Sequence, residues 1–180
     1  MKILFKLFAV FAVIVVVLVA VIKFVQRCSW KVAVGILEEF CNEIKETFGQ
    51  TLTGRNIDLI INNRVRDKAW FDESKMRRVI VNLMKNSSEA MKESGYIRLD
   101  TLIEDDMLLL IVSDNGKGLP ERIKVNLFSP FQTEGKTHGT GLGLAITKKL
   151  VLEHKGSIEY KPNEPQGTIF IIKLPLKEEK

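Results

Sequence analysis

Residues 138–146 read His-Gly-Thr-Gly-Leu-Gly-Leu-Ala-Ile, a glycine-rich loop that runs directly into an apolar helical pattern. The first amides of a helix, and its dipole, favour a bound anion, so this junction predicts a phosphate site at the start of a helix near Gly141–His154. The sequence does not match two other phosphate-binding motifs. Gly135-Lys136-Thr137 would need the first glycine of a P-loop at Pro130. The dinucleotide-binding pattern would need its third glycine at Leu144.

A polar group is expected on an earlier helix, which Asp72 opens as its N-cap. Asn82, Asn86 and Glu89 stand at i, i+4 and i+7, so they share one face of this helix. A carboxamide oxygen is a suitable ligand for a hard cation. Taken alone, the same pattern also describes asparagines on an inert helix surface.

The segment Asp114–Pro120 reads Asp-Asn-Gly-Lys-Gly-Leu-Pro and directly follows an apolar strand. An acid at the end of a strand, followed by two glycines, can accept hydrogen bonds from a ligand while the backbone approaches closely. A plain turn has the same letters. Farther on, Leu127–Thr133 carries two phenylalanines beside a proline, which predicts a loop held to the body by hydrophobic contacts.

In this order and spacing, the four segments resemble the N, G1, F and G2 boxes of the ATP-binding catalytic domain of bacterial sensor histidine kinases. That domain belongs to the gyrase, heat-shock chaperone, histidine kinase and MutL superfamily. The stretch Gly167–Pro175 resembles the family's last strand. The resemblance spans residues 32–176 and implies ATP and Mg²⁺ as cofactors in two-component signal transduction. The implied partner is a phosphoacceptor-histidine domain or a response regulator.

The resemblance implies a role for each motif. Asp114 would bind the exocyclic amine of adenine, and Thr168 would support that contact through water. Asn86 would ligate the magnesium ion, with Asn82 beside it as the second catalytic residue. Residues 119–138 would form a mobile lid. The implied nucleotide contacts are Asn86, Glu89, Asp114, Gly116, Gly118, Thr133, Lys136, Gly139, Thr140, Gly141, Leu142, Gly143 and Thr168.

One position departs from the superfamily's ATPases. They carry a glutamate that activates water four residues before the magnesium asparagine, where this chain has Asn82. A carboxamide has no basic lone pair that accepts a proton at neutral pH. The substitution argues against hydrolysis and for transfer of the γ-phosphoryl to another acceptor.

A second departure concerns the acceptor. Sensor kinases carry a phosphoacceptor histidine on a helical hairpin before this domain, and residues 25–34 leave no room for one. Of the two histidines, His138 lies in the glycine-rich loop and His154 ends a helix, where an imidazole suits the C-terminal dipole. Three explanations stay open: phosphorylation of a histidine in trans, a truncated kinase, or a non-enzymatic nucleotide-sensing membrane module. A serine kinase of the anti-sigma-factor type is a further alternative, but the motifs fit sensor kinases better.

The N-terminal region predicts a membrane anchor. Of the 23 residues from Ile3 to Val25, 21 are apolar. A helix of this length is about 34 Å long and crosses a ~30 Å hydrocarbon core. A cleaved signal peptide is the alternative, but no small-residue cleavage pattern follows. Because ATP is cytoplasmic, the resemblance places residues 27–180 in the cytoplasm, in a single-pass protein of the bacterial inner membrane.

Charge and composition define the remaining organisation. The net charge of +5 comes entirely from residues 1–31, because residues 32–180 carry equal numbers of acids and bases. A neutral domain argues against nucleic acid as a partner. We expect an anchor with its juxtamembrane segment (1–31), a catalytic domain (32–176) and a charged tail (177–180). Mixed helices and strands without regular alternation predict an α/β fold, a two-layer sandwich whose mixed sheet carries about three helices on one face.

Overall fold

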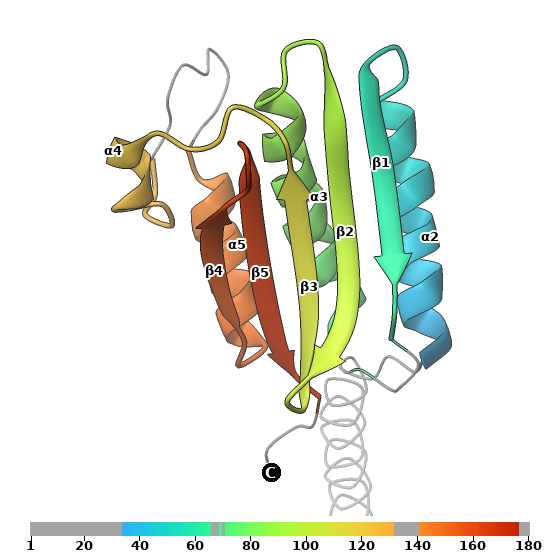
Figure 1. Ribbon diagram of the computed structural model, residues 1–180. Coiled ribbons are helices and arrows are strands. Elements are labelled where there is room, and N and C mark those ends of the chain that lie inside the picture. The colour runs from blue at the N-terminus through green and yellow to red at the C-terminus, as the bar shows by residue number, and fades with distance from the viewer. Residues whose placement is uncertain (1–33, 66–68, 70, 132–140, 177–180) are drawn as a thin grey trace, which may run out of the picture. The chain divides into compact units, whose positions relative to one another are not determined.

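The computed structural model describes residues 34–65, 69, 71–131 and 141–176 of the 180-residue chain (Figure 1). These residues belong to one compact unit, Val32–Lys180. The expected anchor and the charged tail lie outside the described residues. Within the described part of the chain, no helix has the length and apolar character needed to cross a membrane.

The centre of the fold is one five-stranded sheet with the strand order β1-β2-β3-β5-β4. Its first two strands are parallel and every other neighbouring pair is antiparallel, so the sheet is mixed as expected. Between β2 and β3, Asp105 and Asp106 both have positive φ, as a two-residue hairpin turn requires. The strands are β1 (Asn56–Asn63), β2 (Ser94–Glu104), β3 (Met107–Asp114), β4 (Ser157–Pro162) and β5 (Thr168–Pro175).

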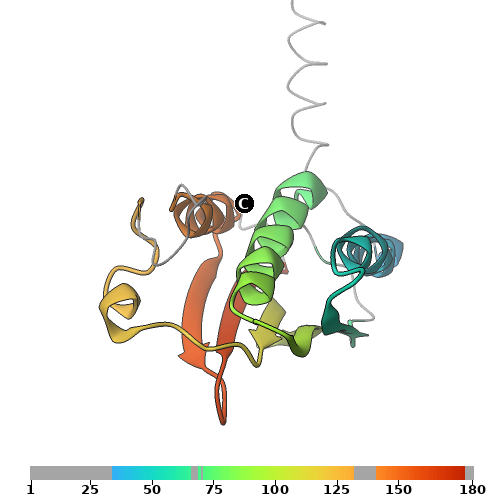
Figure 2. The same ribbon diagram turned by 90° about the horizontal axis from the view of Figure 1, so that it is seen from above.

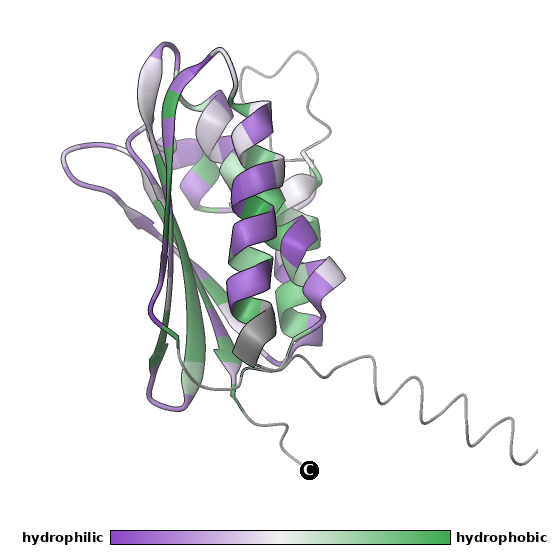
Figure 3. Cartoon of the chain, turned by 90° about the vertical axis from the view of Figure 1, so that its right-hand side faces the viewer, coloured by the Kyte–Doolittle hydropathy of each residue, from purple (hydrophilic) through white to green (hydrophobic). Residues whose placement is uncertain are grey.

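Three helices cover one face of this sheet: α2 (Val34–Thr51), α3 (Glu73–Glu89) and α5 (Gly143–Glu153). They lie side by side in the view from above (Figure 2), and the side view shows them on one side of the sheet only (Figure 3). A fourth, one-turn helix, α4 (Glu121–Lys124), lies beyond the β4 edge. The architecture is the expected two-layer α/β arrangement.

The core forms between the sheet and the three long helices. Alternate residues of the central strands point inward and are buried, which is the period-2 pattern of a half-covered sheet. Each fully buried side chain of this size contributes about 1.5–3 kcal/mol to stability. The inward strand residues include Ile97, Leu99, Leu108, Leu110, Val112, Phe170, Ile172 and Leu174, and α3 buries Met76, Val79, Ile80, Leu83 and Met84.

The segment before α3 differs from what its sequence predicts. Residues 68–71, after the polar turn 62–67, predict a short strand, but Ala69 and Phe71, its described members, have no strand structure. Both side chains are buried in the core, at the point where the chain enters α3. Asp72 caps that start as expected, accepting a 3.1 Å hydrogen bond from the backbone N–H of Lys75.

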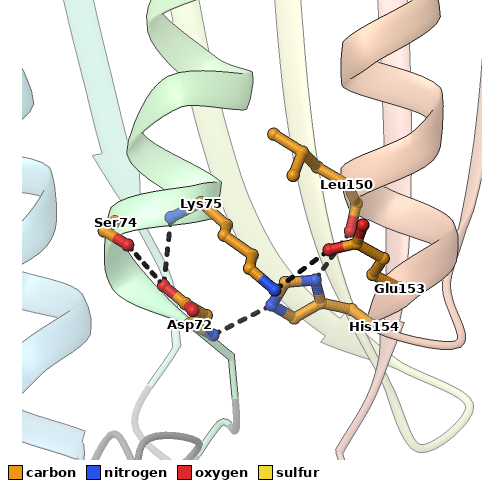
Figure 4. Close-up of polar contacts among 6 residues, drawn as sticks. All are labelled: Asp72, Ser74, Lys75, Leu150, Glu153 and His154. Carbon is orange, nitrogen blue, oxygen red and sulfur yellow. Dashed lines mark hydrogen bonds and ion pairs between the residues drawn. The ribbon is translucent and has the colours of Figure 1, made fainter.

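His154 ties the end of α5 to the start of α3 (Figure 4). Its Nε2 accepts a 2.9 Å hydrogen bond from the backbone N–H of Asp72, and its Nδ1 lies 2.7 Å from the carbonyl oxygen of Leu150. Because an N–H only donates and a carbonyl only accepts, these partners fix a neutral ring with the proton on Nδ1. The expected contact with the helix C-terminus is present, and the bond to α3 is new. An exposed ion pair between Lys75 and Glu153, at 2.9 Å, runs beside it.

The hydrogen bonds of His154 predict an effect on the stability of the fold. His154→Ala removes two hydrogen bonds of a buried ring, so the unfolding free energy should fall by about 2 kcal/mol. Lys75→Ala is the control, since it removes the exposed ion pair and keeps the His154 ring in place, and it should cost less than about 1 kcal/mol. Urea unfolding followed by circular dichroism measures both. Equal losses in the two variants would contradict the assigned role of His154.

Candidate nucleotide-binding site

The site is built around Asp114, the last residue of β3. Its side chain is only 2% exposed and points to the helix-covered face of the sheet, the face that it shares with Leu110 and Val112 of the same strand. Ser87 on α3 donates a 2.7 Å hydrogen bond from Oγ to Oδ2 of Asp114. The backbone N–H of Gly116 donates to Oδ1 at 2.9 Å, and that of Thr168 donates to the same carboxyl group.

Burial dominates the electrostatics of Asp114. It raises the pKa of this carboxyl above its ordinary value, although each of the three hydrogen bonds that the group accepts acts to lower it. A buried carboxylate gains from every further N–H donor that reaches it. The group is therefore well suited to accept a hydrogen bond from a ligand amine.

The strand beside β3 completes this end of the sheet. Thr168, the first residue of β5, pairs directly with Asp114 and is buried. Before it, Gly167 has φ +127°, and a Cβ there would lie 1.9 Å from the carbonyl oxygen of Asp114, so only glycine fits. Asn163 adds a 2.7 Å hydrogen bond from Nδ2 to that same oxygen. The structure thus brings Asp114 and Thr168 together, as predicted.

The turn after Asp114 is fastened to the end of α3. The backbone N–H of Lys117 donates to the carbonyl oxygen of Ala90 at 3.2 Å. Gly118 follows with φ +72°. Arg55 holds the same helix end, with Nη2 donating to the carbonyl oxygens of Ser88 at 2.9 Å and Met91 at 3.1 Å. These bonds fix the last turn of α3 relative to the acid.

The three polar residues predicted on α3 differ in their surroundings. Asn86 is half-buried and Glu89 is exposed. Asn82 faces α5: its Nδ2 donates to Oγ1 of Thr147 at 3.0 Å, and its Oδ1 lies 2.5 Å from where a Cβ on Gly143 would be. The first turn of α5 therefore packs directly against α3, and the carboxamide of Asn82 joins the two helices.

The start of α5 is the place where the sequence predicts a phosphate site. Gly141 has φ +67°, and no side chain within the described residues caps the helix at Leu142. The first amides of a helix favour a bound anion. This start lies at the same end of the sheet as the ends of α3 and β3 (Figure 1). Thr133, Lys136, Gly139 and Thr140, also predicted to contact phosphate, lie outside the described residues.

The aromatic loop agrees with its prediction in part. Leu127 is buried, and Phe128 packs against Phe170 with ring centroids 6.4 Å apart. Phe131 does not pack into the body: it is 76% exposed, with φ +64°. Its backbone N–H donates to the carbonyl oxygen of Gly141 at 2.9 Å, which joins this loop to the start of α5.

Sequence reasoning missed three contributors to the site. Ser87 and Asn163 bond the side chain and the carbonyl of Asp114, and Arg55 holds the end of α3. Their residue types gave little signal, because serine, asparagine and arginine are common on protein surfaces. Only the position of Ser87, directly after the predicted metal ligand Asn86, distinguished this turn in the sequence.

Comparisons with known proteins agree on one family. Residues 71–178 match the family described as histidine kinase-, DNA gyrase B-, and HSP90-like ATPase. The chain is 38% identical over 109 residues to the putative sensor histidine kinase NtrY-like of Rickettsia conorii, covering 59% of this chain and 18% of that protein. It is 29% identical over 147 residues to sporulation kinase C of Bacillus subtilis, covering 77% and 34%. The chain thus spans about a third or less of these relatives.

Solved structures show the same relationship. The catalytic domain of histidine kinase ThkA superposes with a TM-score of 0.70 at 31% identity, covering 79% of this chain and 95% of that one. ThkA in complex with the response regulator protein TrrA gives a TM-score of 0.66 at 29% identity, covering 78% and 40%.

The buried acid predicts how stability depends on pH. Because the folded chain raises the pKa of Asp114, it holds this proton more tightly than the unfolded chain. Over the window between the ordinary and the raised pKa, the folded state binds more protons, so stability from this group falls as pH rises. Asp114→Asn carries no charge, so it should unfold at neutral pH with a free energy equal to or above that of the wild type.

Urea unfolding at about pH 7.5 and about pH 4 tests this expectation, and the difference between the two proteins should shrink at the lower pH. A loss of more than about 1 kcal/mol in Asp114→Asn at neutral pH would show that the ionised group stabilises the fold.

Proposed function

Because the chain belongs to the family of histidine kinase-, DNA gyrase B-, and HSP90-like ATPases and carries an ATP-binding catalytic domain of the histidine kinase type, we propose that it transfers the γ-phosphoryl of Mg-ATP to a histidine of a partner chain. The observation that carries the proposal is Asp114, a buried carboxylate at the end of a strand and at the same end of the sheet as the start of α5.

The proposed binding mode assigns a partner to each end of the nucleotide. Asp114 accepts a hydrogen bond from the exocyclic amine of adenine, and Thr168 stands directly beside it. The first amides of α5, from Leu142 and Gly143, bind the phosphates at the positive end of the helix dipole. Catalysis then depends on holding the triphosphate in place and on neutralising its charge.

Asn86 is the residue that would hold Mg²⁺. The described part of the chain has no cluster of three or more histidine, cysteine or carboxylate groups that could bind a metal. A single amide oxygen fits an ion held mainly by phosphate oxygens and water. When bound, the ion neutralises charge on the phosphates. Asn82 offers no base for water, so the site favours transfer over hydrolysis.

An exposed apolar surface on α5 supports a macromolecular acceptor. Leu152 is one of three large apolar side chains, with Val125 and Phe131, that are strongly exposed in the described residues. It lines a shallow groove with Phe128 and Pro130. Lys148, Lys149 and Glu153 also line this groove, so its charged residues are basic by two to one and it suits an amphipathic helix with acidic residues. We propose that the acceptor domain docks here.

The setting of the domain is also a proposal. Residues 3–25 would anchor the chain in the bacterial inner membrane, with the catalytic domain in the cytoplasm, where ATP is found. The apolar composition of this segment supports the anchor. The complex of ThkA with a response regulator supports a two-component pathway, in which the phosphoryl group passes on to such a regulator.

Nucleotide titration tests the site directly. Asp114→Asn presents an amide N–H or a weaker acceptor to adenine, so ATP affinity should fall by about 100-fold or more, since a charged hydrogen bond inside a buried site is lost. Isothermal titration in the presence of Mg²⁺ measures this, and circular dichroism confirms that the variant is folded. Undiminished affinity would exclude Asp114 as the adenine contact.

A transfer assay tests the proposed acceptor and its docking surface. With labelled ATP, the chain should not label itself but should give an acid-labile product on a supplied histidine-containing helical domain. Leu152→Asp should slow transfer by about tenfold with unchanged ATP binding, because it places a charge in an apolar contact. Leu152→Met is the matched control and should transfer normally.

The outcomes separate the alternatives. Self-labelling would overturn transfer in trans. ATP binding without transfer to any acceptor would favour the nucleotide-sensing module, and acid-stable product on a serine would favour the serine-kinase alternative.

A further inference from the structure

Ser87 is a buried serine in the last turn of α3, and its hydroxyl bonds a residue outside this helix. The side chain is 2% exposed, and Oγ donates to Oδ2 of Asp114 at 2.7 Å. Its neighbour Ser88 shows the ordinary behaviour, with Oγ donating to the carbonyl oxygen of Lys85 in the same helix at 2.9 Å. Two adjacent serines thus have different partners, and only one of them reaches the acid.

The hydrogen bond from Ser87 restrains the orientation of the Asp114 carboxylate. A hydroxyl has one hydrogen to donate, and here it goes to Oδ2. Oδ1 accepts from the backbone N–H of Gly116. With a donor at each oxygen, the carboxylate is held at one rotation about its χ2 bond. Its remaining lone pairs then accept hydrogen bonds in fixed directions.

We propose that Ser87 is a positioning residue that sets the base specificity of the nucleotide site: it holds Asp114 as an acceptor, so the site selects a base with an exocyclic amine over a base with a carbonyl at the same position. This inference rests on the proposed ATP site. A site built to accept an N–H strongly rejects a ligand that presents an oxygen there, because two acceptors would then meet.

The consequence of losing Ser87 follows from the same chemistry. Without the hydroxyl, Oδ2 is buried with one donor fewer, and the carboxylate is less restrained because only backbone donors still hold it. The bond from Ser87 also opposes the rise in the pKa of Asp114 that burial causes. A protonated carboxyl presents an O–H, which can donate to a carbonyl oxygen. Loss of Ser87 should therefore weaken the preference for adenine as well as the affinity for it.

The test compares ATP with ITP, the analogue that carries a carbonyl in place of the amine. The full chain, purified in detergent, is titrated with each nucleotide in Mg²⁺. Ser87→Ala should bind ATP about tenfold more weakly, while ITP affinity stays constant or rises, so the ATP-over-ITP preference shrinks by about tenfold or more.

Ser88→Ala is the matched control, because it also removes a serine hydroxyl from this turn of α3 but leaves the hydrogen bonds of Asp114 in place. It should keep ATP affinity and the preference within about twofold of the wild type. Thermal unfolding accompanies each titration. If Ser87→Ala does not fold, Ser87→Cys replaces it, since a thiol is a weaker donor of similar size and should shift the preference in the same direction.

The outcomes distinguish this inference from the proposed function. A wild-type chain that does not bind ATP would overturn the proposed function and this inference with it. ATP binding by the wild type with an unchanged ATP-to-ITP ratio in the Ser87 variant would overturn the inference alone. An equal loss of both nucleotides would show that Ser87 merely supports the fold.

Discussion

The constraint on which the site depends is the burial of one carboxylate. Asp114 lies between a sheet and a helix with its side chain 2% exposed, and a buried charge is tolerated only where donors surround it. Its donors come from three elements: the hydroxyl of Ser87 on α3, the turn at Gly116, and the start of β5. The acid therefore accepts hydrogen bonds from both of its neighbouring elements, and in the proposed function a ligand amine would be one more donor to it.

The phosphate end of the site depends on how α3 and α5 are held together. At the end of α3 near its cap, His154 bonds the backbone of Asp72. Farther along the same helix, Asn82 bonds Thr147, and the glycine that starts α5 leaves room for that carboxamide. Because these two contacts join α5 to α3 at separate positions along the helices, the start of α5 cannot rotate freely about α3. The distance between Asp114 and the first amides of α5 is therefore set by packing, and in the proposed function a nucleotide would span it.

The sequence predicted the parts of this structure that local rules determine. The cap at Asp72 follows from side-chain chemistry, and the sequence predicted that Asp114 stands at the end of a strand and that a helix begins close to Gly141. The failures lie where distant packing decides. Phe131 had the same apolar character as Phe128, but only Phe128 meets a ring in the sheet, Phe170. The bond from Ser87 to Asp114 joins residues 27 positions apart, and nothing in the residue type says which of two adjacent serines faces the acid.

The position of Asn82 gives a second physical reason to expect transfer in place of hydrolysis. From sequence, the argument is that a carboxamide lacks the basic lone pair needed to activate water. In the structure, the same group is also engaged, since its Nδ2 donates to Thr147 and its oxygen lies against Gly143. A glutamate there would instead accept from the Thr147 hydroxyl, so its carboxylate would also be engaged in the contact between α3 and α5. The helix junction and the missing base are thus two consequences of one residue, and the junction is what the phosphate site needs.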